Sequence, residues 1–219
     1  QQKNLPHNHF LPEKKDWEET LSKMGISNTD KVVIYDNSDL ITSCRCWFQF
    51  LYFGHDSKLV FILDGGLKKW RLESGKVTNK ETKIISSKYF AKENKHMVKI
   101  KSQIEENINK NKFKLLDARS KGRFSGKAKE PRPGVRSGSI EGSICLPYSE
   151  CIDPKDNSFL NKKILSEKFK SLGITGNNVV FSCGSSVTAS VLGLAYSIVN
   201  NDYILNIYIG SWSEYGKIK

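Results

Sequence analysis

Residues 179–189 read Val-Val-Phe-Ser-Cys-Gly-Ser-Ser-Val-Thr-Ala, a short apolar run that ends in a cysteine and continues with small residues. The apolar run predicts a buried parallel strand, and an apolar helix is predicted to begin near Val187. Backbone N–H groups of the loop between them, together with the helix N-terminus, would surround the Cys183 sulfur and stabilise a thiolate. The alternative is a buried, inert thiol, which is the commoner state of a free cysteine.

The same pattern occurs twice in the chain. Three landmarks recur at an offset of 145 to 148 residues: a glycine after a helix, the residue that ends an apolar run, and a glycine turn. The pairs are Gly25 with Gly173, Asp36 with Cys183, and Gly65 with Gly210. A nearly constant offset indicates an internal repeat, in which Asp36 occupies the position of Cys183. We therefore expect the first copy to lack a nucleophile.

Strands that alternate with helices in each copy predict an α/β fold with parallel sheets flanked by helices. Two sequence pairs resemble capping boxes at helix starts, Asp16 with Glu19 and Ser102 with Glu105. A strand predicted at residues 113–117 precedes Cys183 in the second copy, and its counterpart in the first copy would lie before residue 1. We expect a first domain at 1–78 that lacks its N-terminal part, a linker at 79–108 and a second domain at 109–219.

The net charge of the chain indicates which classes of partner it is expected to bind. The formal net charge is +12, and it comes mostly from lysines spread along the chain. Because no compact arginine cluster or aromatic RNA-binding motif accompanies the lysines, we do not expect a nucleic-acid partner. The positive charge fits anionic substrates and acidic protein partners better. No apolar run reaches the length of about 18 residues that a membrane span requires, so we expect no membrane partner.

The five cysteines do not indicate a disulfide framework, because their number is odd and their spacing irregular. Cys44 and Cys46 have no second cysteine or histidine pair nearby, so we expect no metal site, and no cofactor motif is visible. The N-terminus has no apolar signal core. A reducing, cytoplasmic location fits these features best.

At the cysteine loop the chain resembles the tandem rhodanese-type sulfurtransferases, and 3-mercaptopyruvate sulfurtransferases in particular, whose loop usually reads Cys-Gly-Ser-Gly-Val-Thr-Ala. Other matching stretches follow in the family's order over essentially the whole chain. They are residues 33–36, 53–55 and 63–66 in the first copy, and 117–120, 122–126, 130–134 and 210–215 in the second. The resemblance implies two rhodanese-like domains, each with a parallel five-stranded sheet, of which the second is catalytic.

The resemblance also implies the chemistry. Cys183 would take a sulfur atom from 3-mercaptopyruvate as a persulfide and pass it to a thiol acceptor, such as thioredoxin or a small thiol, or to cyanide. Arg123 and Arg132 match the family's substrate arginines, whose planar fork suits a carboxylate. Ser185 matches a serine that relays a proton or polarises the donor. The remaining residues expected around the substrate are Gly184, Ser186, Val187 and Thr188.

Structural roles are the alternative for several of these residues. Arg123 and Arg132 would also serve in salt bridges, and Ser185 in simple loop hydrogen bonds. Arg119 and Arg136 are expected to be structural. The neutral residues Gly184 and Ser185 favour mercaptopyruvate over thiosulfate, whose users usually carry basic residues after the cysteine. Related phosphatases need an arginine where this chain has Ala189, which disfavours a phosphatase.

Two departures from the family pattern keep other functions open. Ser186 stands where glycine is usual, and a positive φ there would cost serine on the order of 1 kcal/mol. Ser139 and Glu141 replace the histidine and proline of the usual Gly-His-Ile-Pro-Gly. A thiosulfate sulfurtransferase, or a non-catalytic rhodanese-like module that binds a partner or carries sulfur, therefore remain alternatives.

Overall fold

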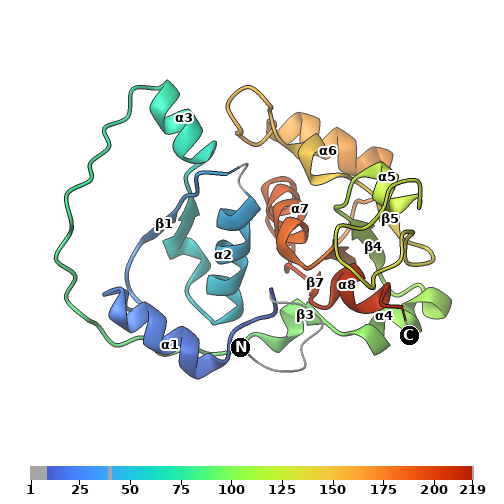
Figure 1. The fold of residues 1–219 in the computed structure, drawn as a ribbon, viewed down its shortest axis with the longest axis horizontal. Helices are drawn as coiled ribbons and strands as arrows, with labels where there is room; N and C mark the ends of the chain where they lie inside the picture. The colour runs from blue at the N-terminus through green and yellow to red at the C-terminus, as the bar shows by residue number, and fades with distance from the viewer. Residues whose placement is uncertain (1–8, 39–40, 219) are drawn as a thin grey trace. The chain divides into compact units, whose positions relative to one another are not determined.

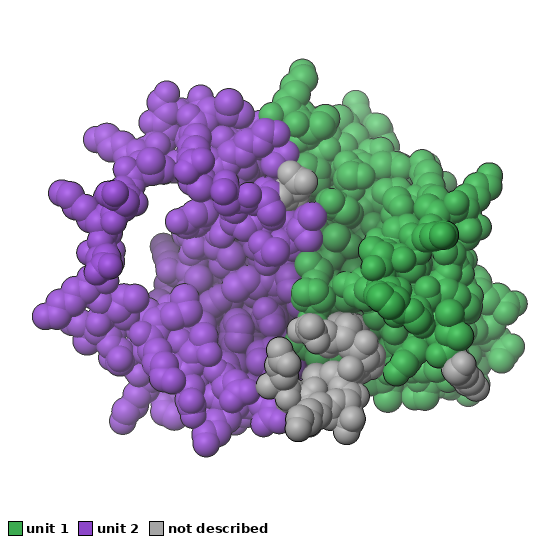
Figure 2. All heavy atoms as spheres, in the orientation of Figure 1, with its two compact units in different colours: residues 1–10, 96–155, 159–219 green, residues 11–95, 156–158 purple. Residues whose placement is uncertain are grey.

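The computed structural model describes residues 9–38 and 41–218 of the chain (Figure 1). The described residues divide into two compact units, coloured separately in Figure 2. Among the described residues, one unit comprises 9–10, 96–155 and 159–218, and the other comprises 11–38, 41–95 and 156–158. The predicted domain limits at 78 and 108 stay predictions. Within the expected linker, residues from 95 onward form a 3₁₀ turn, a strand and the start of a helix.

The unit that contains Cys183 is built on a five-stranded sheet. Its strands stand in the order β3-β7-β6-β4-β5, and every pair of neighbours is parallel. The strands are β3 (Val98–Lys99), β4 (Lys114–Asp117), β5 (Ile144–Cys145), β6 (Val179–Ser182) and β7 (Ile207–Tyr208). The central strand β6 is buried at all four positions, as its unbroken apolar run predicts. The predicted α/β class is confirmed in this unit.

Helices connect these strands. They are α4 (Lys101–Lys110), α5 (Lys121–Phe124), α6 (Lys162–Ser171), α7 (Val187–Val199) and α8 (Ser211–Tyr215), with 3₁₀ turns η2 (Lys95–Met97) and η3 (Tyr148–Cys151). Helix α7 follows β6 directly and packs beside α6 (Figure 1). It is therefore the helix whose N-terminus lies next to Cys183, as the sequence predicts.

Trp212 is central to the core of this unit. Its side chain is fully buried with Ile104, Leu115, Ile140, Val180 and Tyr208. The guanidinium groups of Arg119 and Arg136 lie 4.5 and 4.6 Å from the centre of the indole ring, at cation–π distance. The indole N–H donates to the carbonyl oxygen of Arg136 at 2.6 Å. Both arginines thus support the core, in agreement with the structural roles expected for them.

The other unit contains the first copy of the repeat. Its elements are α1 (Lys14–Lys23), β1 (Val32–Ile34), α2 (Ile41–Tyr52), η1 (Ser57–Leu59), β2 (Val60–Ile62) and α3 (Gly66–Leu72). Strands β1 and β2 pair in parallel. The described residues of this unit thus supply two of the five strands expected for a whole domain. Val33 and Phe61 on these strands are exposed, as is Tyr35 just after β1.

The two copies share their local geometry. Helix α1 ends before Gly25 and helix α6 ends before Gly173, and both glycines have a φ of 72°. This left-handed conformation ends a helix at little steric cost only for glycine. A strand and then a helix follow each glycine, so the internal repeat predicted from the sequence is confirmed in its order of elements.

The predicted capping boxes are wrong in position. The N-cap of α1 is Glu13 rather than Asp16, and that of α4 is Ile100 rather than Ser102. In α4, Gln103 Oε1 accepts a hydrogen bond from the Ile100 amide at 3.0 Å, so a glutamine takes the reciprocal role expected of Glu105. Among the helices in the described part of the chain, none is long and apolar enough to cross a membrane.

Candidate active site

Cys183 lies between the end of β6 at Ser182 and the start of α7 at Val187. Its side chain is buried, with 2% of the residue's surface exposed. All five cysteines are free thiols. Burial raises the pKa of Cys145 and of Cys46 to about 11 and that of Cys151 to about 12, so these three thiols are protonated at neutral pH.

Helix α8 forms hydrogen bonds to the loop that follows Cys183. The amide of Trp212 donates to the carbonyl of Cys183 and the amide of Ser213 donates to the carbonyl of Gly184, both at 2.9 Å. In a trans peptide the N–H points away from the C=O of the same peptide plane. The amides of Gly184 and Ser185 therefore face the opposite side of the loop. Within the described residues, neither of these amides has a hydrogen-bond acceptor.

Ser211, the first residue of α8, forms three further hydrogen bonds that stabilise this loop. Its hydroxyl oxygen accepts hydrogen bonds from the amides of Cys183, at 3.3 Å, and Ser186, at 3.0 Å, and donates to the carbonyl of Tyr208 at 2.9 Å. Ser211 is fully buried and has a φ of 51°. Ser211 lies in the family-like stretch 210–215, but no role was predicted for it from the sequence. Its position beside a glycine turn was the only available signal.

Ser186 adopts the left-handed conformation for which glycine is usual, with a φ of 60°. It is fully buried, and its hydroxyl donates to the carbonyl of Ser185 at 2.7 Å. Ser186 therefore supplies the left-handed residue of this loop although it carries a side chain. Val187 and Thr188 follow in the first turn of α7 and are partly exposed.

The two predicted arginines converge on Gly184. A Cβ atom built on Gly184 would lie 2.9 Å from Nη2 of Arg123 and 3.0 Å from Nη1 of Arg132. Any side chain at this position would force one or both guanidinium groups to move away from the loop. Arg132 Nη2 also donates to the Ser185 hydroxyl at 2.8 Å. The structure thus brings together four of the predicted site residues: Arg123, Arg132, Gly184 and Ser185.

Glu130 is a second residue without a role predicted from the sequence, although it lies in the family-like stretch 130–134. Its carboxylate accepts two hydrogen bonds from Arg123, at 3.1 and 2.6 Å, and one from Arg119 at 2.7 Å. Burial alone would raise the pKa of Glu130, but the hydrogen bonds from Arg123 and Arg119 outweigh it and lower the pKa. Arg119 in turn pairs with Asp117, at the end of β4.

Asp36 shows what the same position holds in the first copy. Its Oδ2 accepts hydrogen bonds from the amides of Thr42 and Ser43, at 3.0 and 2.7 Å, and from the Thr42 hydroxyl at 2.7 Å. Burial opposes ionisation, yet these hydrogen bonds leave the pKa of Asp36 below its ordinary value. The position that follows the strand and faces the helix N-terminus therefore stabilises an anion in this copy.

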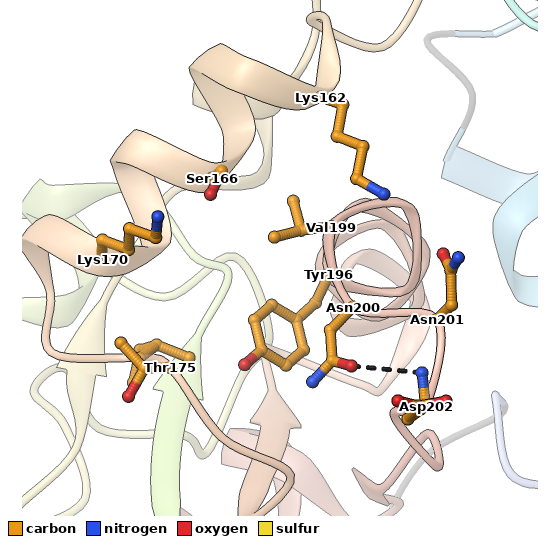
Figure 3. A pocket seen from close by; sticks show the side chains of 10 residues that line it. Lys162, Ser166, Lys170, Thr175, Tyr196, Val199, Asn200, Asn201 and Asp202 are labelled. Carbon is orange, nitrogen blue, oxygen red and sulfur yellow. Dashed lines mark hydrogen bonds between the residues drawn. The ribbon is translucent and has the colours of Figure 1, made fainter.

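A separate cavity of about 480 Å³ lies between α6 and the far end of α7 (Figure 3). Lys162 and Lys170 line it from α6, Tyr196 and Val199 line it from α7, and Asn200 follows the end of α7. None of the predicted site residues lines it. Within the described residues, no group of three or more His, Cys, Asp or Glu side chains could hold a metal ion.

The fold and the site together define a class: an α/β protein with a repeated strand-to-helix turn, in which the second turn presents a cysteine beside two converging arginines. A family profile described as a rhodanese-like domain matches residues 2–73 and 101–217. The chain therefore belongs to the rhodanese-like domain family, and its resemblance to tandem rhodanese-domain proteins is confirmed.

Individual relatives agree. The 3-mercaptopyruvate sulfurtransferase of Mus musculus is 33% identical over 96% of this chain and 70% of its own length. The mitochondrial thiosulfate/3-mercaptopyruvate sulfurtransferase 1 of Arabidopsis thaliana is 32% identical over 97% of this chain, which spans only 60% of that relative. SseA from Escherichia coli, solved as a 3-mercaptopyruvate sulfotransferase, matches with a TM-score of 0.81 at 25% identity, over 96% of this chain and 76% of its own.

Proposed function

We propose that this chain is a sulfurtransferase that moves a sulfur atom from 3-mercaptopyruvate to a thiol acceptor through a persulfide on Cys183. One observation carries the proposal: the cysteine stands at a strand-to-helix turn whose free amides face away from α8, beside the two guanidinium groups over Gly184. Amides without a protein acceptor are suited to an anionic sulfur, and the guanidinium groups to a carboxylate. The names of the relatives support the same reaction.

The reaction proceeds in two displacements. The Cys183 thiolate attacks the sulfur of 3-mercaptopyruvate, the carbon–sulfur bond breaks, and pyruvate leaves as its enolate, which then takes up a proton. The outer sulfur remains on Cys183 as a persulfide held by loop amides. A thiolate acceptor then attacks that sulfur and regenerates the Cys183 thiolate. Such a mechanism is expected to show ping-pong kinetics.

The arginines bind the donor and stabilise the charge that develops on it. Arg132 lies within hydrogen-bond distance of Ser185, so the two side chains act on the same part of the donor. We assign the carboxylate to the guanidinium groups of Arg123 and Arg132, and the polarisation of the keto group or a proton relay to Ser185. Gly184, Ser186, Val187 and Thr188 supply the backbone that surrounds the sulfur.

The acceptor is proposed as a thiol, with thioredoxin or a small thiol as candidates and cyanide as a substitute. No cofactor takes part in either step. A thiosulfate donor is the second candidate, because paired guanidinium groups also suit a sulfonate and the Arabidopsis relative is named for both donors.

Steady-state assays test the proposal. The wild-type protein should release pyruvate from 3-mercaptopyruvate over repeated turnovers only when a thiol acceptor is present, with parallel lines in double-reciprocal plots. Cys183→Ser should abolish release, whereas Cys145→Ala, a matched change of a thiol in the same unit, should retain it. A large preference for thiosulfate would assign the second candidate instead. Inactivity with both donors would leave only the binding or sulfur-carrier module.

A further inference from the structure

The two arginines over Gly184 differ in their counter-charges. Arg123 forms a two-pronged ion pair with Glu130, whose carboxylate is almost completely buried. Arg132 makes a neutral hydrogen bond to the Ser185 hydroxyl and, within the described residues, no ion pair. The two guanidinium groups are therefore not equivalent to an incoming anion, although they lie at similar distances from Gly184.

The formal charges around Arg123 are balanced, whereas that of Arg132 is not. Arg119 pairs with Asp117 at 2.7 Å, and Glu130 bridges Arg119 and Arg123. Two carboxylates thus balance two guanidinium groups in this network. When Arg132 is added to these four residues, the charge left over among the five is the single positive charge of Arg132.

We propose that Glu130 determines donor selectivity by restricting the site to one net positive charge, which matches a monoanionic α-keto carboxylate and disfavours a dianion. The inference rests on the proposed function, since it concerns the choice between its two donors. A mercaptopyruvate carboxylate neutralises Arg132. Thiosulfate carries two negative charges and would leave one of them uncompensated beside Glu130.

Glu130 is buried and fixed in place, so its negative charge acts on a bound anion with little screening by solvent. Its side chain is 1% exposed and is held by three hydrogen bonds from two arginines, so it cannot turn out to solvent and be screened. The same bonds lower its pKa, which keeps the carboxylate ionised at neutral pH. Glu130 also fixes the orientation of Arg123, so charge and positioning must be separated by experiment.

The test compares three variants with both donors. Glu130→Gln keeps the shape and removes the charge, and we expect the ratio of kcat/KM for thiosulfate to kcat/KM for 3-mercaptopyruvate to rise about tenfold, or about 1.4 kcal/mol. Glu130→Asp keeps the charge and shortens the side chain, so both rates should fall while the ratio stays near wild type. The double variant Glu130→Gln with Arg123→Gln restores the charge count, and its ratio should return toward wild type.

Near-UV circular dichroism identifies any variant that does not fold. If Glu130→Gln does not fold, inhibition of turnover by two simple anions is measured instead. Sulfate, a dianion, should bind to both Glu130→Asp and the wild type less than threefold more tightly than acetate, a monoanion. Equal effects of Glu130→Gln on both donors, or a shifted ratio in Glu130→Asp, would overturn the inference. If the wild type turns over neither donor, the proposed function fails instead, so the two failures are distinguishable.

Discussion

Ser186 adopts a backbone conformation that side chains usually avoid. Its φ of 60° places Cβ close to the following carbonyl oxygen, which costs roughly 1 kcal/mol for any residue except glycine. Buried surroundings and a hydrogen bond from its hydroxyl to the Ser185 carbonyl hold it there. The loop therefore stores a small strain beside the proposed nucleophile.

A comparison of Ser186→Gly with Ser186→Ala isolates that strain, because both variants lose the hydroxyl and only glycine relaxes the backbone. We expect the glycine variant to be about 1 kcal/mol more stable than the alanine variant. Urea denaturation measures the difference. An alanine variant as stable as the glycine variant would show that the loop relaxes without strain.

The role of a residue could be predicted from the sequence where a local motif contained it. The local pattern predicted the turn that carries Cys183, whereas the role of Arg123 and Arg132 beside it was implied only by the family resemblance. Glu130 and Ser211 received no role, because their functions depend on partners that tertiary folding brings to them. Ser211 meets Cys183 from 28 residues away. No periodicity or local motif reports such a contact.

At the scale of elements, α8 fixes the loop between β6 and α7. The amides of Trp212 and Ser213 orient the loop carbonyls, and the Ser211 hydroxyl accepts from two loop amides. A five-residue helix at the end of the repeat thus determines the direction of the amides that would face a persulfide.

Ser211→Gly removes that acceptor while suiting the φ of 51°. Two buried amides are left unpaired, so we expect a loss of about 2 kcal/mol of unfolding free energy and slower loading of Cys183 with sulfur. Asn111→Gly is the control, because Asn111 is exposed in the same unit with a φ of 47°. It should change stability by less than about 1 kcal/mol. Equal stability of the two variants would refute the support assigned to Ser211.

The existence and order of the helices and strands were predicted better than the residues at which the helices begin. The buried strands and the glycine-terminated helices appear where the apolar runs place them, because buried parallel strands leave a strong pattern. The helix starts were wrong by two or three residues, since Ile100 and Glu13 cap helices without a side-chain signature. End effects are weak and are overridden by packing.

At the scale of the molecule, carboxyl groups held by hydrogen bonds occur in both units. The pKa values of five of them are lowered: Asp30, Asp36, Glu106, Glu130 and Asp156. The folded chain therefore binds protons more weakly than the unfolded chain at these groups. Their contribution to stability is fully present above the unfolded pKa values, about 4 to 4.5, and is lost as the pH falls through the folded values.

We therefore expect the urea midpoint to change little from about pH 6 to 5 and to fall steeply below about pH 4.5. In Glu130→Gln the acid-dependent fall should be smaller, because one of the five groups no longer titrates. Equilibrium denaturation at a series of pH values measures both. A midpoint that rises on acidification would contradict the assigned directions of the pKa shifts.

Sulfur transfer by this chain requires a sulfur atom bound at Cys183, and intact-mass spectrometry after incubation with 3-mercaptopyruvate measures that atom directly. The wild type and Cys145→Ala should each gain one sulfur atom, which a reducing thiol removes, and Cys183→Ala should gain none. An unchanged wild-type mass, or an equal gain in Cys183→Ala, would contradict the account.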